Sequence, residues 1–208
     1  MSERTPFRLP EDGADKARLL SRLLETIEND ILPLSARGVA AGNKIFGAAL
    51  LRKSDLSLVL ADTNNELANP LWHGEIQCLK SFFELAKRPA TDELLFLSTH
   101  EPCSLCLSAI TWSGFDNFFY LFSHADSRDA FAIPHDLRIL GEVFGLDDGE
   151  YARRNAYWSC WSIMDEIHGL GDDGRELLLE RADRIVRVYR ELSESYQETK
   201  AASAIPLR

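Results

Sequence analysis

Two cysteines stand three residues apart in the segment EPCSLC (101–106), which follows an apolar run that is typical of a buried strand. Thiols at this spacing, Cys103 and Cys106, can form a redox pair, half of a structural zinc site, or part of a catalytic site. The sequence has two further cysteines, Cys78 and Cys160. Residues elsewhere in the sequence distinguish between these three kinds of site.

A second pair of reactive residues, His73 and Glu75, opens a predicted helix in the segment WHGEIQC. In α/β folds, ligand sites gather where helix N-termini meet the carboxyl ends of strands, and both segments lie at such positions. One imidazole and two thiolates suit zinc, and three protein ligands leave its fourth position open, as in catalytic sites. A carboxylate beside that position can take a proton from water and deliver it to a leaving group. We therefore expect His73, Cys103 and Cys106 to hold Zn²⁺, with Glu75 as the catalytic proton carrier.

Two other kinds of site remain as alternatives. A structural zinc site needs a fourth ligand, but Cys78 follows His73 by five residues, about 140° around an ideal helix, so it should face away. Cys160 lies between two tryptophans in an apolar run, where packing in the core is the expected role. A thioredoxin-like redox pair at Cys103 and Cys106 leaves the His-x-Glu segment without a role.

The elements that must position these residues are predicted from apolar periodicity. Apolar side chains at helical spacing predict a helix over 14–32, which Pro33 should end before a loop, SARGVAAGN. Two short apolar runs predict a β-hairpin over 45–51 and 56–61, followed by a turn-rich stretch at 62–70. Further helices are expected at 72–87, 103–112, 136–144 and 174–196, and further strands at 93–99, 117–122 and 156–163.

The order of these elements predicts the fold class. Strands that alternate with helices imply right-handed crossovers and a sheet covered on both faces. We expect an α/β fold, a three-layer α/β/α sandwich with a mixed sheet of about five strands. A chain of 208 residues suits a single domain over 1–208. Its core is expected at about 40–145, with an N-terminal helix at 14–32 and a C-terminal helical extension at 145–208.

Charge and composition restrict the expected partners. The formal net charge of −10 makes nucleic acid an unlikely partner, because phosphate contacts depend on Lys and Arg. Arginines do gather at 175–190, but interleaved acidic residues predict a solvated helix face with i,i+4 ion pairs. No signal peptide or membrane span is expected, and four cysteines in such a chain favour a reducing, cytoplasmic location. A small uncharged molecule is the expected substrate.

The segments HGE (73–75) and PCSLC (102–106) together resemble the zinc-dependent cytidine deaminase superfamily, in which nucleobase deaminases carry this signature. The resemblance runs from about Phe46 to Asp129. Within the superfamily, EPCSLCLSAITWSGFDNFFYLFSHAD is most similar to guanine deaminases, then to tRNA adenosine deaminases and fungal cytosine deaminases. The resemblance implies hydrolytic deamination of a nucleobase or related amino-substituted heterocycle, with a guanine-type purine favoured. It also implies a homodimer.

The resemblance assigns further residues to substrate binding. The asparagine that binds substrate in the family corresponds to Asn65, or to Asn64 if the loop is shifted. Backbone amides of Gly74 and Ser104 fall where the family contacts the ring and the zinc-bound oxygen. Trp112 fits the guanine-deaminase pattern and is expected either in the pocket wall or in the core.

Three departures from the family pattern concern the substrate. Gly74 stands where the family usually has alanine, and NPLW (69–72) replaces DPTA, which places Trp72 at the expected pocket edge. The acidic residue with which guanine deaminases hold the purine has two candidates, Asp129 and Asp136. Of the neighbouring residues, His100 is expected beside the ligands or on the surface, Glu101 is expected to position backbone, and His124, His135 and His168 are expected to be structural or exposed.

Three alternative functions remain open. A tRNA adenosine deaminase would use the same centre but would need a basic groove. A cytosine or nucleoside deaminase would act on pyrimidines. A non-catalytic, zinc-stabilised interaction domain would bind the metal and turn over nothing.

Overall fold

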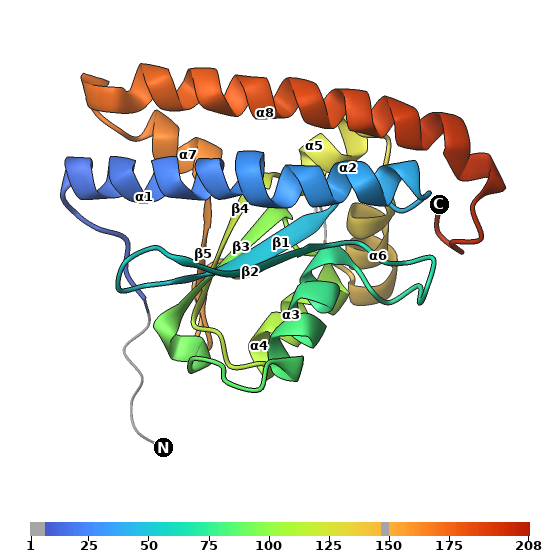
Figure 1. Ribbon diagram of the computed structural model, residues 1–208, viewed down its shortest axis with the longest axis horizontal. Helices are drawn as coiled ribbons and strands as arrows, with labels where there is room; N and C mark the ends of the chain where they lie inside the picture. Colours follow the sequence, from blue (N-terminus) through green and yellow to red (C-terminus); the bar gives the residue numbers. More distant parts are fainter. Residues whose placement is uncertain (1–6, 147–149) are drawn as a thin grey trace.

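The structure, a computed structural model that describes residues 7–146 and 150–208, contains a five-stranded mixed sheet between two helical layers (Figure 1). The strand order is β2-β1-β3-β4-β5. The first three strands in this order pair antiparallel, and the pairs β3–β4 and β4–β5 are parallel. The strands are β1 (Gly47–Arg52), β2 (Leu58–Thr63), β3 (Leu94–His100), β4 (Asn117–Phe122) and β5 (Ser159–Ser162). The predicted α/β class, the mixed sheet and the hairpin are confirmed.

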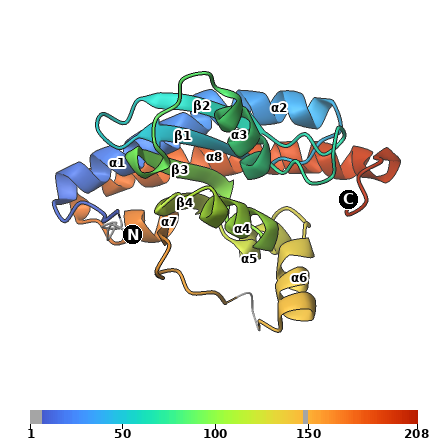
Figure 2. The same ribbon diagram turned by 90° about the horizontal axis from the view of Figure 1, so that it is seen from below.

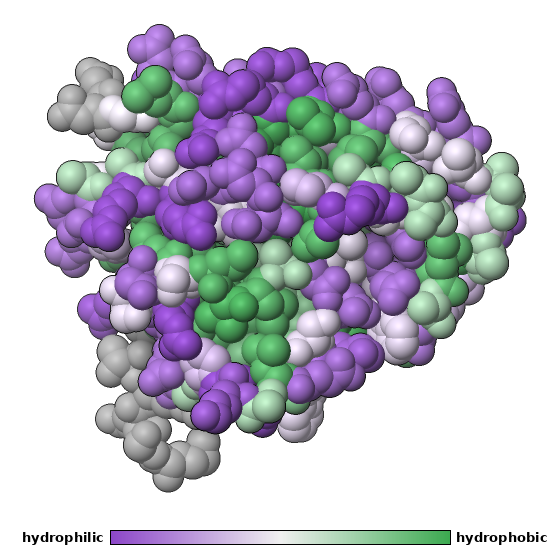
Figure 3. Space-filling model, viewed as in Figure 1, coloured by the Kyte–Doolittle hydropathy of each residue, from purple (hydrophilic) through white to green (hydrophobic). Residues whose placement is uncertain are grey.

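Two long helical segments cover one face of the sheet and lie side by side (Figure 1). One runs through α1 (Gly13–Thr26), the π-helical turn η1 (Ile27–Ile31) and α2 (Leu32–Ala40), and the other is α8 (Asp172–Thr199). The short α7 (Ile163–His168) packs beneath them, and the 3₁₀ turn η4 (Lys200–Ala202) follows α8. All of these except η4 share one apolar core with the sheet, and their outward faces in Figure 3 are largely hydrophilic.

The opposite face of the sheet carries α3 (Gly74–Glu84) and α4 (Ser104–Trp112), seen from below in Figure 2. A second apolar core lies between these helices and the sheet. The 3₁₀ turn η2 (Thr91–Glu93) leads into β3, and α5 (His124–Asp129) and α6 (His135–Phe144) follow β4. Both central strands, β3 and β4, are buried along their whole length, as their continuous apolar runs predict.

The prediction that Pro33 ends the first helix was wrong, because the helical path continues to Ala40. Between α1 and α2, the N–H of Leu32 bonds to the carbonyl of Ile27, the i→i+5 spacing of a π turn. The π turn restarts the helix, so Pro33 falls in the first turn of α2, where a missing N–H costs nothing. The stretch that reads as a loop is therefore mostly helix.

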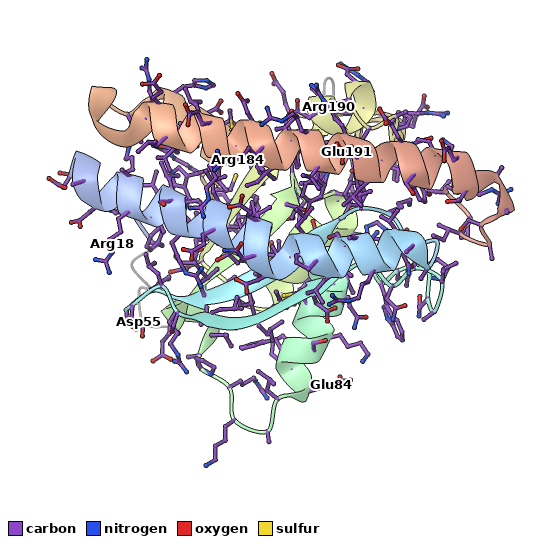
Figure 4. All side chains as sticks on the ribbon, turned by 45° about the horizontal axis from the view of Figure 1, so that its top comes forward. Arg18, Asp55, Glu84, Arg184, Arg190 and Glu191 are labelled. Carbon is purple, nitrogen blue, oxygen red and sulfur yellow. The ribbon has the colours of Figure 1, made fainter. Side chains whose placement is uncertain are left out.

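The C-terminal segment is more than a helical extension, because it adds the edge strand β5 to the sheet. α8 then covers the face of the sheet opposite to α3 and α4. Expectations that fall on 1–6 and 147–149 lie outside the described residues. Arg184 and Arg190 of α8, labelled in Figure 4, are exposed, whereas Arg181 is half-buried. The expected i,i+4 pairs are not found within the described part of α8, and Arg181 and Arg184 instead pair with Glu28 of η1.

None of the helices in the described residues is long and apolar enough to cross a bilayer.

Candidate metal centre

His73 and the two cysteines of the 103–106 segment meet at the N-termini of two helices. His73 is the N-cap residue of α3, and Cys103 is the N-cap residue of α4. The Sγ atom of Cys103 lies 3.5 Å from His73 Nδ1 and 3.5 Å from the Sγ atom of Cys106, which lies 3.7 Å from the same nitrogen. The three side chains form the one group of possible metal ligands among the described His, Cys, Asp and Glu residues.

These distances fit zinc. With Zn–S bonds of about 2.3 Å and Zn–N bonds of about 2.0 Å, the edges of a tetrahedron between ligand atoms are about 3.5–3.8 Å long. Two sulfurs and one nitrogen are also ligands that zinc prefers. The remaining cysteines lie apart from the metal group, since Cys78 and Cys160 are both buried in the core beneath α3 and α4, as expected.

Glu75 reaches the same site from the first turn of α3. Its side chain is buried, and the thiol of Cys106 lies within hydrogen-bond distance of Glu75 Oε2 at 3.4 Å. The hydroxyl of Ser98, on β3, donates to Glu75 Oε1 at 2.9 Å. Burial raises the pKa of Glu75 above its usual value, and the nearby charge of Cys103 adds to that effect. The carboxyl group is therefore more readily protonated than an exposed glutamate.

The ligands are electrostatically coupled. Burial opposes a charge on His73, but the contact with Cys103 and the charges of Cys103, Glu66 and Glu75 outweigh it and raise the pKa of His73 to about 9. The hydrogen bond from Cys106 lowers the pKa of Cys103, while burial and the neighbouring thiolate raise that of Cys106. In the absence of metal, the two thiols therefore share one proton.

A small cavity of about 10 Å³ connects the metal ligands with residues from three other segments. It is lined by Phe46, His73, Glu75, His100, Glu101, Cys103, Cys106 and Asp136. This volume accommodates about one water molecule. A heterocycle therefore requires a wall of the cavity to move.

The two candidate aspartates lie in different surroundings. Asp136, in the first turn of α6, lines the cavity, and burial raises its pKa to about 7, with a further contribution from the charge of Cys103. Asp129, at the end of α5, is largely exposed and pairs with Arg128 at 2.6 Å. The structure thus brings Asp136 to the metal centre and leaves Asp129 outside it.

Trp112 is not part of the core, because its side chain is 91% exposed, and it does not line the cavity at the metal centre. Trp112 is the last residue of α4, eight residues beyond Ser104 and about 12 Å along the helix from the end that meets the metal ligands. Trp72 is also absent from the cavity lining as described, and its half-buried ring instead lies 5.4 Å from Lys80 Nζ.

The two asparagines of the loop between β2 and α3 differ in what they contact. Asn64 is buried, and its amide group donates to Glu66 Oε2 at 2.5 Å. Asn65 is half-buried, and its backbone N–H bonds to the carbonyl of Trp72. Neither lines the cavity. Ser104 begins α4 directly after the ligand Cys103, so its backbone N–H lies at the helix N-terminus.

Gly74 has a structural reason to differ from alanine. A Cβ atom at this position would lie 2.7 Å from the Cα atom of Gly47, closer than real Cβ contacts allow. The N-terminus of α3 therefore packs directly on the start of β1. This close approach places His73 and Glu75 against the sheet.

Several residues near the site were missed or only partly predicted. His100 is buried, so the surface alternative was wrong. Its ring packs against Phe46, its Nε2 atom has no partner in the described structure, and burial lowers its pKa well below the usual value. Glu101 does position backbone, since it accepts the N–H of His124 at 3.0 Å. The predictions did not include Tyr151, which donates to Glu101 at 2.7 Å, because it lies 50 residues away in sequence.

Of the other expected structural or exposed histidines, His124 is buried, His135 is half-buried and His168 is exposed.

Comparisons with known proteins agree with the metal site. Residues 26–122 match the family described as the cytidine and deoxycytidylate deaminase zinc-binding region. Guanine deaminase of Bacillus subtilis (strain 168) is 28% identical over 109 residues, which cover 51% of this chain and 69% of that protein.

Solved structures of related proteins show more distant similarity. A guanine deaminase from Bacillus subtilis has a TM-score of 0.45 at 26% identity, covering 53% of this chain and 68% of the other. One from Nitrosomonas europaea has a TM-score of 0.47 at 19% identity, covering 91% and 90%. A structure from a study of A-to-I editing by tRNA:A34 deaminases has a TM-score of 0.46 at 15% identity, covering 77% and 99%.

Proposed function

Since residues 26–122 match the family described as the cytidine and deoxycytidylate deaminase zinc-binding region, we propose that the protein is a zinc-dependent hydrolase that deaminates a nucleobase or related heterocycle. The observation that carries the proposal is the position of Glu75. Its buried carboxyl group lies beside the His73–Cys103–Cys106 set, which a purely structural metal site would not need. A guanine-type purine is the favoured substrate.

The proposed reaction replaces the amino group of the ring by oxygen from water and releases ammonia. His73, Cys103 and Cys106 would hold zinc, which would supply the Lewis acidity that lowers the pKa of water to near neutral pH. Glu75 would take one proton of the water and transfer it to the ring nitrogen, then take the second proton from the hydroxyl group on the attacked carbon and deliver it to the amino group, which leaves as ammonia. Ser98 holds one oxygen of Glu75, which leaves the other directed to the metal side.

Two sets of groups are proposed to contact the substrate, one that binds the edge of the ring and one that stabilises negative charge. Asp136 lies in the cavity with Glu75, and its carboxylate can accept both the N1–H and the 2-amino hydrogens of guanine. The backbone N–H groups of Gly74 and Ser104 stand at helix N-termini, where they can stabilise developing negative charge. Asn65 remains a proposed contact that would require the loop between β2 and α3 to adjust.

The small volume of the cavity implies that one of its walls moves when a ring enters, and α6 is the element that we propose to move. Asp136 stands in the first turn of α6, and of the ten residues of this helix only Leu140 is fully buried. The helix is therefore less firmly anchored than α3, which buries five of its eleven residues. We propose that displacement of this first turn admits the substrate and that its return brings Asp136 onto the ring.

The proposal extends to the cellular location and the oligomeric state of the protein. Cys103 and Cys106 must stay reduced to bind zinc, which supports a cytoplasmic location. A homodimer is supported by the outer face of α4, where Leu105 and Trp112 are exposed two helical turns apart.

Ammonia release from the zinc-loaded protein tests the proposed reaction. The panel should hold guanine, adenine, cytosine, their nucleosides, an amino-triazine and a tRNA. We expect turnover of guanine, slowed by about 10²–10⁴-fold in Glu75→Gln while one zinc stays bound. We expect Asp136→Asn to lose mainly guanine binding, seen as a raised KM. Release of ammonia from the tRNA alone would favour the editing alternative, and no release from any member would leave a non-catalytic role.

A further inference from the structure

Glu66 is a buried carboxylate next to the metal centre that the proposed reaction does not use. It lies on the irregular loop between β2 and α3, and its side chain is 2% exposed. Burial of an ionised carboxylate is strongly unfavourable unless the charge is paired and its oxygens accept hydrogen bonds. The burial of a carboxylate in this loop therefore needs a specific explanation.

Both oxygens of Glu66 accept hydrogen bonds, one from the segment before β1 and one from its own loop. Lys44, three residues before β1, is almost equally buried and places its Nζ atom 2.9 Å from Glu66 Oε1. The amide group of Asn64 donates to Glu66 Oε2 at 2.5 Å. In addition, the side-chain oxygen of Asn43 accepts the backbone N–H of Leu67, so the same segment fixes the loop. The position of the carboxylate is thus determined from both sides.

The imidazole of His73 lies between this carboxylate and the thiols. Its Nε2 atom is 3.6 Å from Glu66 Oε1, whereas its Nδ1 atom faces the sulfurs of Cys103 and Cys106 at 3.5 and 3.7 Å. Nδ1 can bind a metal only if it carries no proton, and a neutral imidazole then carries its proton on Nε2. Glu66 is the carboxylate that faces that proton.

We propose that Glu66 is a positioning residue for the metal centre. Its Oε1 atom, 3.6 Å from His73 Nε2, attracts the N–H of that nitrogen electrostatically and so favours the ring orientation and the tautomer in which Nδ1 binds zinc, while Lys44 supplies the compensating charge. Carboxylates that hold a ligating histidine in this way typically change metal affinity by about 10–100-fold. The inference rests on the metal centre of the proposed function and is independent of which ring is deaminated.

The alternative is that Glu66 and Lys44 form a structural pair that ties the loop to β1. A structural role would lower thermal stability when the pair is broken but would leave metal binding unchanged. The chain offers a matched control in Asp116, whose buried side chain pairs with Lys53 at 2.7 Å and takes no part in the metal site. Asp116→Asn therefore measures the loss of thermal stability when such a pair is broken, with no effect on the candidate zinc ligands.

The experiment measures zinc affinity by competition with a chelator, together with the absorption spectrum of the Co²⁺-substituted protein. For Glu66→Gln we expect zinc affinity about 10–100-fold weaker than for the unchanged protein and a shifted Co²⁺ spectrum. For Asp116→Asn we expect both to be unchanged. If Glu66→Gln binds zinc as tightly as the unchanged protein and gives the same Co²⁺ spectrum, the inference is overturned.

A second variant keeps the test readable if Glu66→Gln does not fold. Removal of one member of a buried pair leaves a lone buried charge, whereas Lys44→Met/Glu66→Gln removes both charges together. The double variant should fold and still lose zinc affinity, and undiminished affinity in it would equally overturn the inference. Because neither readout involves a substrate, a failure of the proposed deamination does not affect this result.

Discussion

At the scale of single residues, the metal ligands occupy positions that helices usually give to other side chains. N-cap residues are commonly Ser, Thr, Asp or Asn, whose oxygen bonds to a free N–H of the first turn. His73 and Cys103 are both N-caps, and neither side chain makes that bond. Their side chains face the metal site instead. Both helices therefore lack the stabilising hydrogen bond of an N-cap side chain at the ends that meet the candidate metal site.

Zinc binding to the metal-free protein should release about two protons per metal at pH 7. One comes from His73, whose pKa of about 9 leaves it protonated at this pH, and one is the proton that Cys103 and Cys106 share. Zinc affinity should therefore rise by about 100-fold per pH unit between pH 6 and 8. Calorimetric titrations in buffers of different ionisation enthalpy measure the number. Release of less than one proton would show that these ligands are already deprotonated without metal.

The meeting of His73, Glu75, Cys103 and Cys106 at one place could be predicted because each stands in a short segment whose spacing has chemical meaning. Glu66 could not, since it lies in a loop, and its proposed role toward His73 depends on a pairing with Lys44, 22 residues away in sequence. The exposure of Trp112 could not be predicted either, because a tryptophan at the end of a short helix has the same local pattern whether it faces a pocket or solvent. Only the direction of α4 decides its surroundings.

At the scale of elements, two glycines set the distance between the helical layers and the site. A Cβ atom at Gly47 would clash with a methyl group of Ile31, and one at Gly74 would lie 2.7 Å from the Cα atom of Gly47. The π turn η1, the strand β1 and the helix α3 therefore stack in direct contact. Through this stack, the first helical segment supports the helix that carries His73.

Replacement of Gly74 by alanine should destabilise the protein, although alanine is usual at this position in the family that the sequence resembles. The added methyl group meets the backbone of Gly47, which cannot move without shifting β1. We expect the free energy of unfolding to fall by about 1–3 kcal/mol, measured by chemical denaturation.

Gly13→Ala is the matched control, because no atom lies within 4 Å of the added carbon and the residue is helical. It should change stability by less than about 0.5 kcal/mol. Equal stability of Gly74→Ala and the unchanged protein would contradict the close contact between α3 and β1.

Periodicity predicted the existence of most elements and placed their ends less well. The hairpin, β3, β4 and α4 follow directly from apolar runs and turn residues. The continuation of the first helix past Pro33 did not, because a π turn leaves no pattern in the sequence that distinguishes it from a helix end. α5 and α7, each of six residues, are too short to show a helical stripe.

At the scale of the whole molecule, elements from the N-terminal and C-terminal parts of the chain pack on the same sheet. The C-terminal segment supplies β5 to the sheet, and α8 then packs along the N-terminal helix on the opposite face from α3 and α4 (Figure 1). Tyr189 of α8 reaches the ring of His100, which lines the cavity at the metal centre. We propose that residues 1–208 form a single domain, since the described terminal helices share the core of the sheet.

The exposed face of α4 should mediate a homodimer. We expect the zinc-loaded protein to sediment as a dimer at micromolar concentration and Trp112→Ser to weaken the dimer by about tenfold or more, with unchanged thermal stability of the monomer. Leu177→Ser is the control, because that side chain is 71% exposed on α8, in the other helical layer. A monomeric unchanged protein at tens of micromolar would contradict the dimer.

Hydrolytic deamination is tested most directly by the origin of the oxygen in the product. The zinc-loaded protein is incubated with guanine and the other amino-heterocycles in ¹⁸O-labelled water, and the rings are analysed by mass spectrometry together with the ammonia released. The account predicts one ¹⁸O atom in the product ring for each ammonia, with guanine converted fastest and no conversion by Glu75→Gln on the same time scale. Fully zinc-loaded protein that leaves every ring unlabelled and releases no ammonia would contradict it.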